Sequence, residues 1–337
     1  MKLLQIINLH TSFFTHIGEV KAVRGISLEL SHGGVLGIVG ESGCGKSVSM
    51  LSVTGLLAET GKITEGQVIF EDRDITKYTD KQMARLRGNE ISMIFQDPMT
   101  SLNPLLSIGS QLTEHLIKHK RVTRGEARKR ALDMLRLVGI PDAEKRINQY
   151  PHEFSGGMRQ RAMIAASLIC RPKLIIADEP TTALDVTIQA QILDLMKDLR
   201  ARLDTSIILI THDLGVVADI CSRVAVMYGG LIVELGPARD IFYHSRHPYT
   251  LGLMKSVPNP RTKSAAKEKL KPIDGQPPDL FKPPPGCPFA PRCDYAMKIC
   301  LRAPSPFYKI SEEHDSACFL NDRNASVTAP WGKEGQS

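Results

Sequence analysis

The segment GESGCGKS, Gly40 to Ser47, constrains the fold more strongly than any other part of this sequence. Its spacing, G-x-x-x-x-G-K-[ST], is that of a loop whose backbone N–H groups surround a phosphate. The apolar run VLGIV precedes it and the helical pattern SVSMLSVTGLL follows it. A helix that begins here directs the positive end of its dipole at the anion. Strand, loop and helix therefore come in the order that a nucleotide site requires, which favours such a site over an ordinary glycine-rich turn.

Individual residues of this loop have expected roles in binding ATP. Lys46 is expected to reach the β- and γ-phosphates, and the hydroxyl of Ser47 to bind Mg²⁺. The glycines allow the sharp backbone turns that aim the N–H groups at one anion. The predicted nucleotide-binding set in this loop is Gly40, Glu41, Ser42, Gly43, Cys44, Gly45, Lys46, Ser47 and Val48.

Two further apolar runs end in residues suited to phosphate chemistry. KLIIADEP ends in Asp178 and Glu179, and ILITHD places His212 after its strand. At the carboxyl edge of a parallel sheet, Asp178 is placed to hold Mg²⁺ and Glu179 to act as general base toward the attacking water. His212 is suited to contact the γ-phosphate. One acidic turn or one strand-end histidine is more often structural, but two carboxylates after four apolar residues favour catalysis.

Apolar runs alternate with amphipathic patterns over most of the chain, which predicts an α/β fold with a parallel sheet covered on both faces. Between about 97 and 170 the pattern is mostly helical, with RGEARKRALDMLRLVGI as its clearest stretch. Of 21 prolines, 12 lie between Pro258 and Pro306, which excludes long helices and central strands there. We expect a core at 1–255 with a helical subdomain at about 97–170, a Pro/Cys-rich C-terminal extension at 256–325 and a disordered tail at 326–337.

The order of these motifs, with FSGGMRQR between them, resembles that of ATP-binding cassette (ABC) ATPases. The resemblance covers residues 1 to about 250 and implies a P-loop NTPase of the ABC type. It also implies a head-to-tail dimer, in which ATP lies between Lys46 of one subunit and the signature serine of its partner. The matched residues are Ser155, Gly156 and Gly157 in the signature, Gln96 in the loop that senses Mg²⁺ or water, and Asp185 in the loop that crosses the dimer interface.

The same resemblance assigns roles to these residues. Ser47, Gln96 and Asp178 are the implied Mg²⁺ ligands, and Glu179, His212 and Gln96 are the implied catalytic residues. For the adenine ring the family uses an aromatic side chain after the first strand: Phe13 fits best by spacing, with Phe14 and His16 as alternatives.

The signature departs from the common Leu-Ser-Gly-Gly-Gln at both of its outer positions. Phe154 is an apolar replacement, whereas Met158 removes a polar side chain. This departure implies a weaker signature half-site, or pairing with a second, non-identical cassette subunit.

The segment RHPYTLGLMKSVPNP, residues 246–260, and the Pro-rich stretch after it resemble the C-terminal extension of dipeptide/oligopeptide importers. This resemblance implies an ATPase subunit that energises peptide uptake through two separate transmembrane permease subunits, served by an extracytoplasmic binding protein. Import of nickel or glutathione is an alternative within the subgroup. A soluble cassette ATPase in DNA repair or translation is an alternative outside it. His247 and Tyr249 could form a pair of ligands. The favoured interpretation is that they belong to a turn that docks the extension onto the ATPase core.

Hydropathy and charge indicate where in the cell the protein is located. No apolar run approaches the roughly 20 residues that cross a bilayer. The N-terminal stretch MKLLQIINLHTSFF is typical of a first strand and not of a signal peptide. The basic run RTKSAAKEKLK lacks interleaved aromatics, which favours a solvated linker over a nucleic-acid arm. These features predict a cytosolic protein that binds no nucleic acid. The resemblance to importer subunits implies a peripheral position on the cytoplasmic side of the inner membrane.

Four of the seven cysteines, Cys287, Cys293, Cys300 and Cys318, lie in the extension, separated by 5, 6 and 17 residues. These gaps lack the tight pairs of structural zinc sites. Four thiolates on irregular backbone suit a [4Fe–4S] cluster, which would supply folding energy to an extension without a core of its own. Importers of the resembled subgroup with this cysteine pattern are associated with such a cluster. Zinc, with His314 as a substitute ligand, and free thiols or disulfides are the alternatives.

The other three cysteines have expected structural roles. Cys44 is a small residue of the phosphate loop, and Cys170 and Cys221 lie singly at predicted helix ends.

Overall fold

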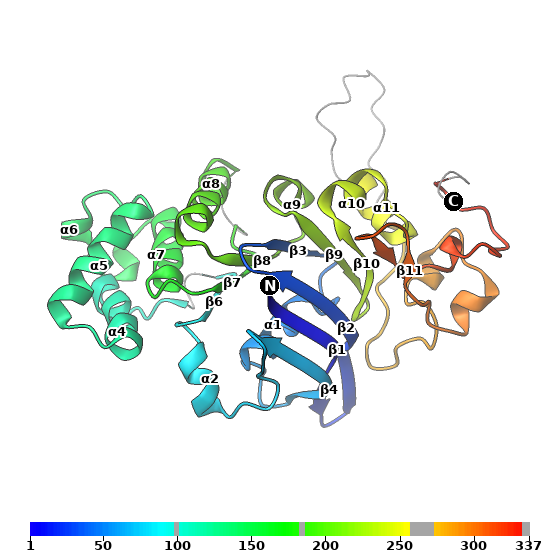
Figure 1. The fold of residues 1–337 in the computed structure, drawn as a ribbon, viewed down its shortest axis with the longest axis horizontal. Helices are drawn as coiled ribbons and strands as arrows, with labels where there is room; N and C mark the ends of the chain where they lie inside the picture. Colours follow the sequence, from blue (N-terminus) through cyan, green and yellow to red (C-terminus); the bar gives the residue numbers. More distant parts are fainter. Residues whose placement is uncertain (98–100, 182–185, 257–272, 332–337) are drawn as a thin grey trace, which may run out of the picture. The chain divides into compact units, whose positions relative to one another are not determined.

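The computed structural model describes residues 1–97, 101–181, 186–256 and 273–331 (Figure 1). The chain divides into two compact units. The first comprises Met1–Leu3, Leu30–Val35 and Lys77–Ile210, and the second comprises Leu4–Glu29, Leu36–Thr76 and Thr211–Ser337. This division crosses the predicted boundary at 255, because the C-terminal extension belongs to the same unit as the phosphate loop.

The first unit holds three parallel strands and the helical subdomain. Strand β7 (Leu174–Asp178) pairs with β6 (Ile91–Ile94) on one side and with β8 (Ser206–Ile210) on the other. All five residues of β8 are buried, as expected for a strand covered on both faces. The helices of this unit are α2 (Asp80–Leu86), α4 (Ile108–Lys120), α5 (Arg124–Leu137), α6 (Ala143–Arg146), α7 (Gly156–Leu168) and α8 (Val186–Leu203), with the 3₁₀ turn η1 (Pro151–Glu153).

Four of these helices begin at a hydroxyl side chain that caps the first turn: α2 begins after Thr79, whose side chain accepts the backbone N–H of Gln82, and α4, α5 and α7 follow the same pattern. The side chains of Ser107, Thr123 and Ser155 accept the backbone N–H of Ser110, Glu126 and Met158 respectively. Such a bond satisfies one of the donors that a helix start leaves without an intrahelical partner. Helices α4, α5 and α7 pack on one another through their apolar faces. The described residues between 101 and 170 are thus mostly helical, as the sequence pattern predicts.

The second unit contains an antiparallel sheet in the order β2-β1-β4-β5. Long strands β1 (Lys2–Thr15) and β2 (Gly18–Ser31) lie beside β4 (Gly61–Phe70) and the short β5 (Arg73–Asp74). The N-terminal strand predicted from MKLLQIINLHTSFF is confirmed by β1.

The same unit carries strands in the order β11-β12-β10-β9-β3. Strand β3 (Val35–Val39) is parallel to β9 (Arg223–Tyr228), and β9 is antiparallel to β10 (Leu231–Pro237). The C-terminal extension adds β12 (Asp315–Ser316) to the edge of β10 and β11 (Tyr308–Lys309) beyond it. The helices of this unit are α1 (Lys46–Thr54), α9 (Leu214–Ile220), α10 (Ala238–Tyr243) and α11 (Pro248–Lys255).

The described residues of the extension form only short elements, as its proline content predicts. Besides β11 and β12 it forms three 3₁₀ turns, η2 (Ala290–Arg292), η3 (Lys298–Leu301) and η4 (Phe319–Asn321). The predicted basic linker 261–271 lies outside the described residues.

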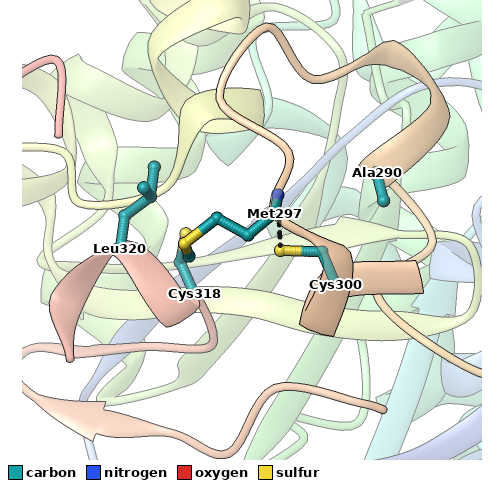
Figure 2. Packing of buried hydrophobic residues seen from close by; sticks show 5 residues of the cluster. All are labelled: Ala290, Met297, Cys300, Cys318 and Leu320. Carbon is teal, nitrogen blue, oxygen red and sulfur yellow. Dashed lines mark hydrogen bonds between the residues drawn. The ribbon is translucent and has the colours of Figure 1, made fainter. Parts of the chain in front are cut away.

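The expectation that the extension lacks a core is wrong. Ala290, Met297, Cys300, Cys318 and Leu320 form a buried apolar cluster (Figure 2). Val327 and Trp331 pack against this cluster, although both belong to the stretch predicted as a disordered tail. Residues 332–337 lie outside the described part of the chain. A few well-placed apolar and sulfur-containing side chains therefore suffice for a small core.

Within the described residues, no helix combines the length and the hydropathy needed to span a bilayer.

Candidate nucleotide-binding and catalytic site

The predicted phosphate loop connects β3 to α1. Gly45 is the residue before α1 and has φ 101°, and a Cβ added there would lie 2.5 Å from the carbonyl oxygen of Ala22. Only glycine combines this backbone conformation with so close an approach. The loop therefore folds as its sequence predicts and delivers the N-terminus of α1 to the anion position.

Lys46 is buried at the start of α1, with 6% of the residue exposed. Its ammonium donates to the carbonyl oxygens of Gly40 at 2.8 Å and Glu41 at 2.9 Å, so the loop itself holds the lysine in place. Ser47 follows it on the same helix, half-buried. The helix ends at Thr54 and not at Leu57 as its pattern suggested, because Gly55 adopts a left-handed conformation with φ 63°.

The predicted carboxylates follow β7 in the first unit. Asp178 is the last residue of β7, and Glu179 turns the chain with φ 48° while its N–H donates to the carbonyl oxygen of Ile210 at 2.9 Å. The side-chain amide of Gln96 donates to Oε2 of Glu179 at 3.1 Å. The structure thus brings together Glu179 and Gln96, two residues that lie 83 positions apart in the sequence.

His212 lies exposed at the start of the second unit's last segment, next to a tightly held turn. The hydroxyl of Thr211 accepts the N–H of Asp213 at 3.0 Å, and the carboxylate of Asp213 accepts the N–H of Gly215 at 2.9 Å. Both flanking residues are therefore fixed by hydrogen bonds that begin helix α9.

The signature residues Ser155 and Gly156 are exposed at the start of α7, whereas Phe154 is buried. Gly157 faces Ile188 of α8: a Cβ added there would lie 3.2 Å from the Cγ2 of that isoleucine. The exposed serine and glycine suit a half-site that acts on a nucleotide held by another subunit.

Gln160 is a site-supporting residue that the sequence argument missed. It is buried in α7, with 2% exposed, and its side-chain amide donates to the carbonyl oxygen of Pro180, the residue after Glu179. The signature helix therefore supports the turn that carries the predicted base. A polar residue on the apolar face of a helix was the only signal for it in the sequence.

Two predictions on nucleotide contacts have different outcomes. Asp185 lies outside the described residues. Phe13 is half-buried on β1 and packs against Gly61, where an added Cβ would lie 2.8 Å from the ring carbon Cε1. Its alternatives Phe14 and His16 are exposed.

The Mg²⁺ ligands predicted from the sequence are divided between the units. Ser47 lies in the second unit, and Gln96 and Asp178 lie in the first. A hydroxyl, an amide oxygen and a carboxylate form the all-oxygen donor set that Mg²⁺ prefers, so the chemistry of these residues fits the ion.

All four cysteines of the extension line one small cavity, together with Phe289 and Leu320. The backbone N–H of Met297 donates to the sulfur of Cys300 at 3.5 Å. Burial raises the pKa of the thiols of Cys287, Cys293 and Cys318, and the backbone N–H groups of Phe289, Tyr295 and Leu320 offset this rise only in part. The Met297–Cys300 bond is visible in Figure 2. The burial that raises these pKa values favours the neutral thiol, whereas a cluster ligand is a thiolate. The four cysteines share a cavity, but the described residues contain no group of three or more His, Cys, Asp or Glu side chains arranged to hold a metal, so the predicted cluster is not supported.

The described residues support neither the cluster nor the alternatives based on one metal ion or on a disulfide. None of their groups of three or more His, Cys, Asp or Glu side chains is arranged to hold a metal ion. His314, the substitute zinc ligand, is instead 2.8 Å from the carboxylate of Glu234. All seven cysteines, including the four around the cavity, are free thiols.

Comparison with known proteins defines the class to which this fold and these motifs belong. Residues 23–182 match the ABC transporter family, and residues 233–300 match the C-terminal region of oligopeptide/dipeptide transporters. The chain belongs to the ABC transporter family, as an ATP-binding subunit that carries the oligopeptide/dipeptide C-terminal region.

Particular relatives are similar over nearly the whole chain. The dipeptide transport ATP-binding protein DppD of Bacillus subtilis is 55% identical over 96% of this chain and 96% of its own. The oligopeptide transport ATP-binding protein OppD of Bacillus subtilis is 55% identical over 98% of this chain and 92% of its own. OppD of Salmonella typhimurium is 52% identical over 94% of this chain and 93% of its own.

Solved structures extend the similarity to the fold. A dimeric ATP-binding cassette in a post-hydrolysis state, bound to ADP and phosphate, matches with TM-score 0.64 and 28% identity. The match covers 70% of this chain and 99% of that one. The protein cbiO1 of Clostridium perfringens, part of the cbiONQ ABC transporter complex, matches with TM-score 0.62 and 29% identity over 72% of this chain and 90% of its own. The predicted ABC ATPase fold is thus confirmed.

Proposed function

We propose that this chain is the ATP-hydrolysing subunit of an importer that takes up di- and oligopeptides through separate membrane permease subunits. The observation that carries the proposal is one polypeptide that joins an ABC cassette to the oligopeptide/dipeptide C-terminal region. Relatives with this organisation over nearly their full length are dipeptide and oligopeptide transport ATP-binding proteins.

The chemistry of the proposal uses the residues predicted from the motifs. Lys46 would exchange the loop carbonyls for the β- and γ-phosphates, and Ser47, Gln96 and Asp178 would hold Mg²⁺, which would neutralise phosphate charge. Glu179, oriented by Gln96, accepts a proton from the attacking water as its oxygen bonds to the γ-phosphorus and the bond to ADP breaks. His212 contacts the γ-phosphate, and Phe13 stacks on the adenine. The signature Ser155, with Gly156 and Gly157, completes the site from a second subunit.

The proposal includes the assembly. The second cassette is a non-identical paralogue whose own signature motif compensates for Met158 in this chain. The loop of this chain that contains Asp185 contacts the corresponding loop of the paralogue across the dimer interface. Two permease subunits bind near Gln96 and the helical subdomain, and a binding protein outside the membrane delivers the peptide. The chain then works as a peripheral protein on the cytoplasmic face of the inner membrane.

Reconstitution tests this function directly. The chain is purified with its permeases and paralogue in proteoliposomes, and ATP-dependent uptake of a labelled dipeptide is measured. We expect Lys46→Ala to abolish ATP binding and uptake with the fold intact, and the exposed Lys62→Ala to leave both unchanged. Uptake of Ni²⁺ or glutathione instead of peptide would contradict the substrate class. Copurification with ribosomes or DNA, and not with permeases, would overturn the importer itself.

The extension is proposed to hold a [4Fe–4S] cluster on Cys287, Cys293, Cys300 and Cys318. What supports this proposal is the shared cavity that the four cysteines line. When bound, the cluster would supply cross-links between η2, η3 and the segment before η4, and no electron partner is needed for that role.

Iron and sulfide analysis after anaerobic purification tests the cluster. We expect about four irons and four sulfides per chain with broad visible absorption, lost in Cys293→Ser and retained in Cys170→Ser. Cys170 lies in the other unit and serves as the matched control. A colourless protein that carries one zinc, or none, would contradict the proposal.

A further inference from the structure

The phosphate loop is in contact with the C-terminal extension through one arginine. Arg292 ends the turn η2, and its Nη1 lies 2.7 Å from Oε2 of Glu41, the second residue of the loop. The arginine side chain is 6% exposed and that of Glu41 is 23% exposed, so solvent screens this pair weakly. The two residues are 251 positions apart in the sequence.

Arg292 is itself held in one conformation. Its Nε donates to the carbonyl oxygen of Asp274 at 2.8 Å, its Nη2 to that of Ile273 at 2.8 Å, and its Nη1 also donates to the hydroxyl of Tyr228 at 3.0 Å. The guanidinium lies 5.7 Å from the ring centre of Tyr228 and 6.0 Å from that of Phe289. A planar cation with so many fixed donors is preorganised and loses little conformational entropy on binding Glu41.

The backbone of Glu41 is held separately by Tyr249. The backbone N–H of Glu41 donates to the Tyr249 hydroxyl at 2.8 Å. Tyr249 is fully buried, and its ring packs 4.5 Å from that of Tyr228 and 5.4 Å from that of Phe289. Both the side chain and the main chain of Glu41 are therefore fixed by residues that lie outside the phosphate-loop motif.

The position of Glu41 bears on the nucleotide in two ways. Its carbonyl oxygen accepts a hydrogen bond from Lys46 at 2.9 Å, so a shift of Glu41 moves the acceptor that holds the phosphate-binding lysine. Its carboxylate is also a negative charge beside a site for a highly charged anion. An unpaired carboxylate there would repel the phosphates, and the cation of Arg292 neutralises it.

We propose that Arg292 is a positioning residue for ATP. By binding and neutralising Glu41, Arg292 holds the phosphate loop in the conformation that binds ATP. The C-terminal extension therefore contributes directly to nucleotide affinity. The proposal rests on the proposed ATPase function and adds to it a residue that lies outside the cassette motifs.

Nucleotide binding in four variants tests this role. We measure the Kd for Mg·ATP, and the KM and kcat of hydrolysis, in Arg292→Ala, Arg292→Lys, Glu41→Gln and the double variant Arg292→Ala/Glu41→Gln. We expect Arg292→Ala to raise Kd and KM roughly tenfold with a much smaller change in kcat, and Arg292→Lys to recover part of the loss. In the Glu41→Gln background the loss should shrink, since no charge is left unpaired. The matched control is Arg302→Ala, an exposed arginine of the same extension.

Each other outcome has a defined meaning. An unchanged Kd in folded Arg292→Ala overturns the proposal. An equal loss in both Glu41 backgrounds does so as well, because a merely structural arginine would behave in this way. If Arg292→Ala fails to fold, Arg292→Lys decides: parental Kd and KM in that variant contradict the need for a guanidinium whose several donors are held in place. Failure of the ATPase function itself is distinguished by the parental chain, which would then bind no ATP and be indifferent to Lys46→Ala.

Discussion

Glu179 has a backbone conformation that residues with a side chain seldom adopt. Its φ of 48° places it in the left-handed region, directly after the buried strand β7. Such a conformation costs on the order of 1 kcal/mol and persists where surrounding contacts impose it. Here the N–H bond to Ile210 and the Gln96 amide impose it, and together they aim the carboxylate. This geometry is consistent with the role of general base.

Glu179→Gln should lower the rate of ATP hydrolysis by about 100-fold or more, because the amide no longer accepts the proton of the attacking water. The affinity for ATP should stay within a few-fold of the parental value. Steady-state phosphate release and equilibrium ATP binding measure the two quantities. The exposed Glu59→Gln is the control, and a parental rate in Glu179→Gln would exclude Glu179 as the base.

Cys221 gives a test of burial that depends on pH. Burial raises the pKa of its thiol to about 12, and the residue is 7% exposed. Since the thiolate is the nucleophile, Cys221 in the folded protein should resist alkylation by iodoacetamide until the pH approaches that value. Unfolding in denaturant should restore the reactivity of an ordinary thiol at pH 8–9. Peptide mass spectrometry measures the modified fraction; rapid native alkylation at neutral pH would contradict the buried environment.

At the scale of single elements, periodicity and motif order predicted most of the structure. The strands β1, β3, β7 and β8 and the helices α5 and α7 follow from apolar patterns and from the order of the motifs. The end of α1 did not, because the apolar residues after Gly55 continue the pattern while the glycine breaks the helix. Local signals thus fix where an element begins more reliably than where a glycine ends it.

Replacing two glycines of the helical subdomain by alanine should change the free energy of unfolding in opposite directions. Gly109 of α4 donates its N–H to the carbonyl oxygen of Ile147 at 2.7 Å, and a Cβ there would lie 2.6 Å from the Cγ1 of that isoleucine. Gly109→Ala should therefore lower the free energy of unfolding by about 1–3 kcal/mol.

Gly125 of α5 is the matched position, since a Cβ there meets no atom within 4 Å. Gly125→Ala should raise the free energy of unfolding by about 0.5–1 kcal/mol, because alanine restricts the unfolded chain and favours the helix. Urea denaturation followed by circular dichroism measures both variants. Equal effects of the same sign would show that the contact with Ile147 is unimportant.

At the scale of the whole molecule, contacts between distant segments are what the sequence did not reveal. Glu234 lies in the apolar strand β10, and nothing nearby indicates a partner. Its carboxylate, fully buried, is 2.8 Å from Nε2 of His314 and also accepts the N–H of Arg246. Composition led us to expect His314 as a possible metal ligand and the extension as coreless. Only the folded chain shows that this histidine instead fixes β12 against β10.

His314→Ala should destabilise the protein by about 1–3 kcal/mol, because it leaves the buried carboxylate of Glu234 without that hydrogen bond. The extension should also become more sensitive to limited proteolysis. His244→Ala, at an exposed position, is the control. Urea denaturation and protease digestion give the two readouts, and a parental response in both would show that the pair contributes nothing to docking.

The contact between Glu41 and Arg292 also limits how such proteins can be recombined. A chimera that joins this cassette to the extension of another relative would keep the glutamate but receive whatever residue that extension offers in place of the arginine. An unmatched junction would leave a half-buried, unpaired carboxylate beside the nucleotide, even if both halves folded. Glu41, Arg292 and the two tyrosines, Tyr228 and Tyr249, therefore depend on one another. A chimera should remain functional only if all four residues are kept together.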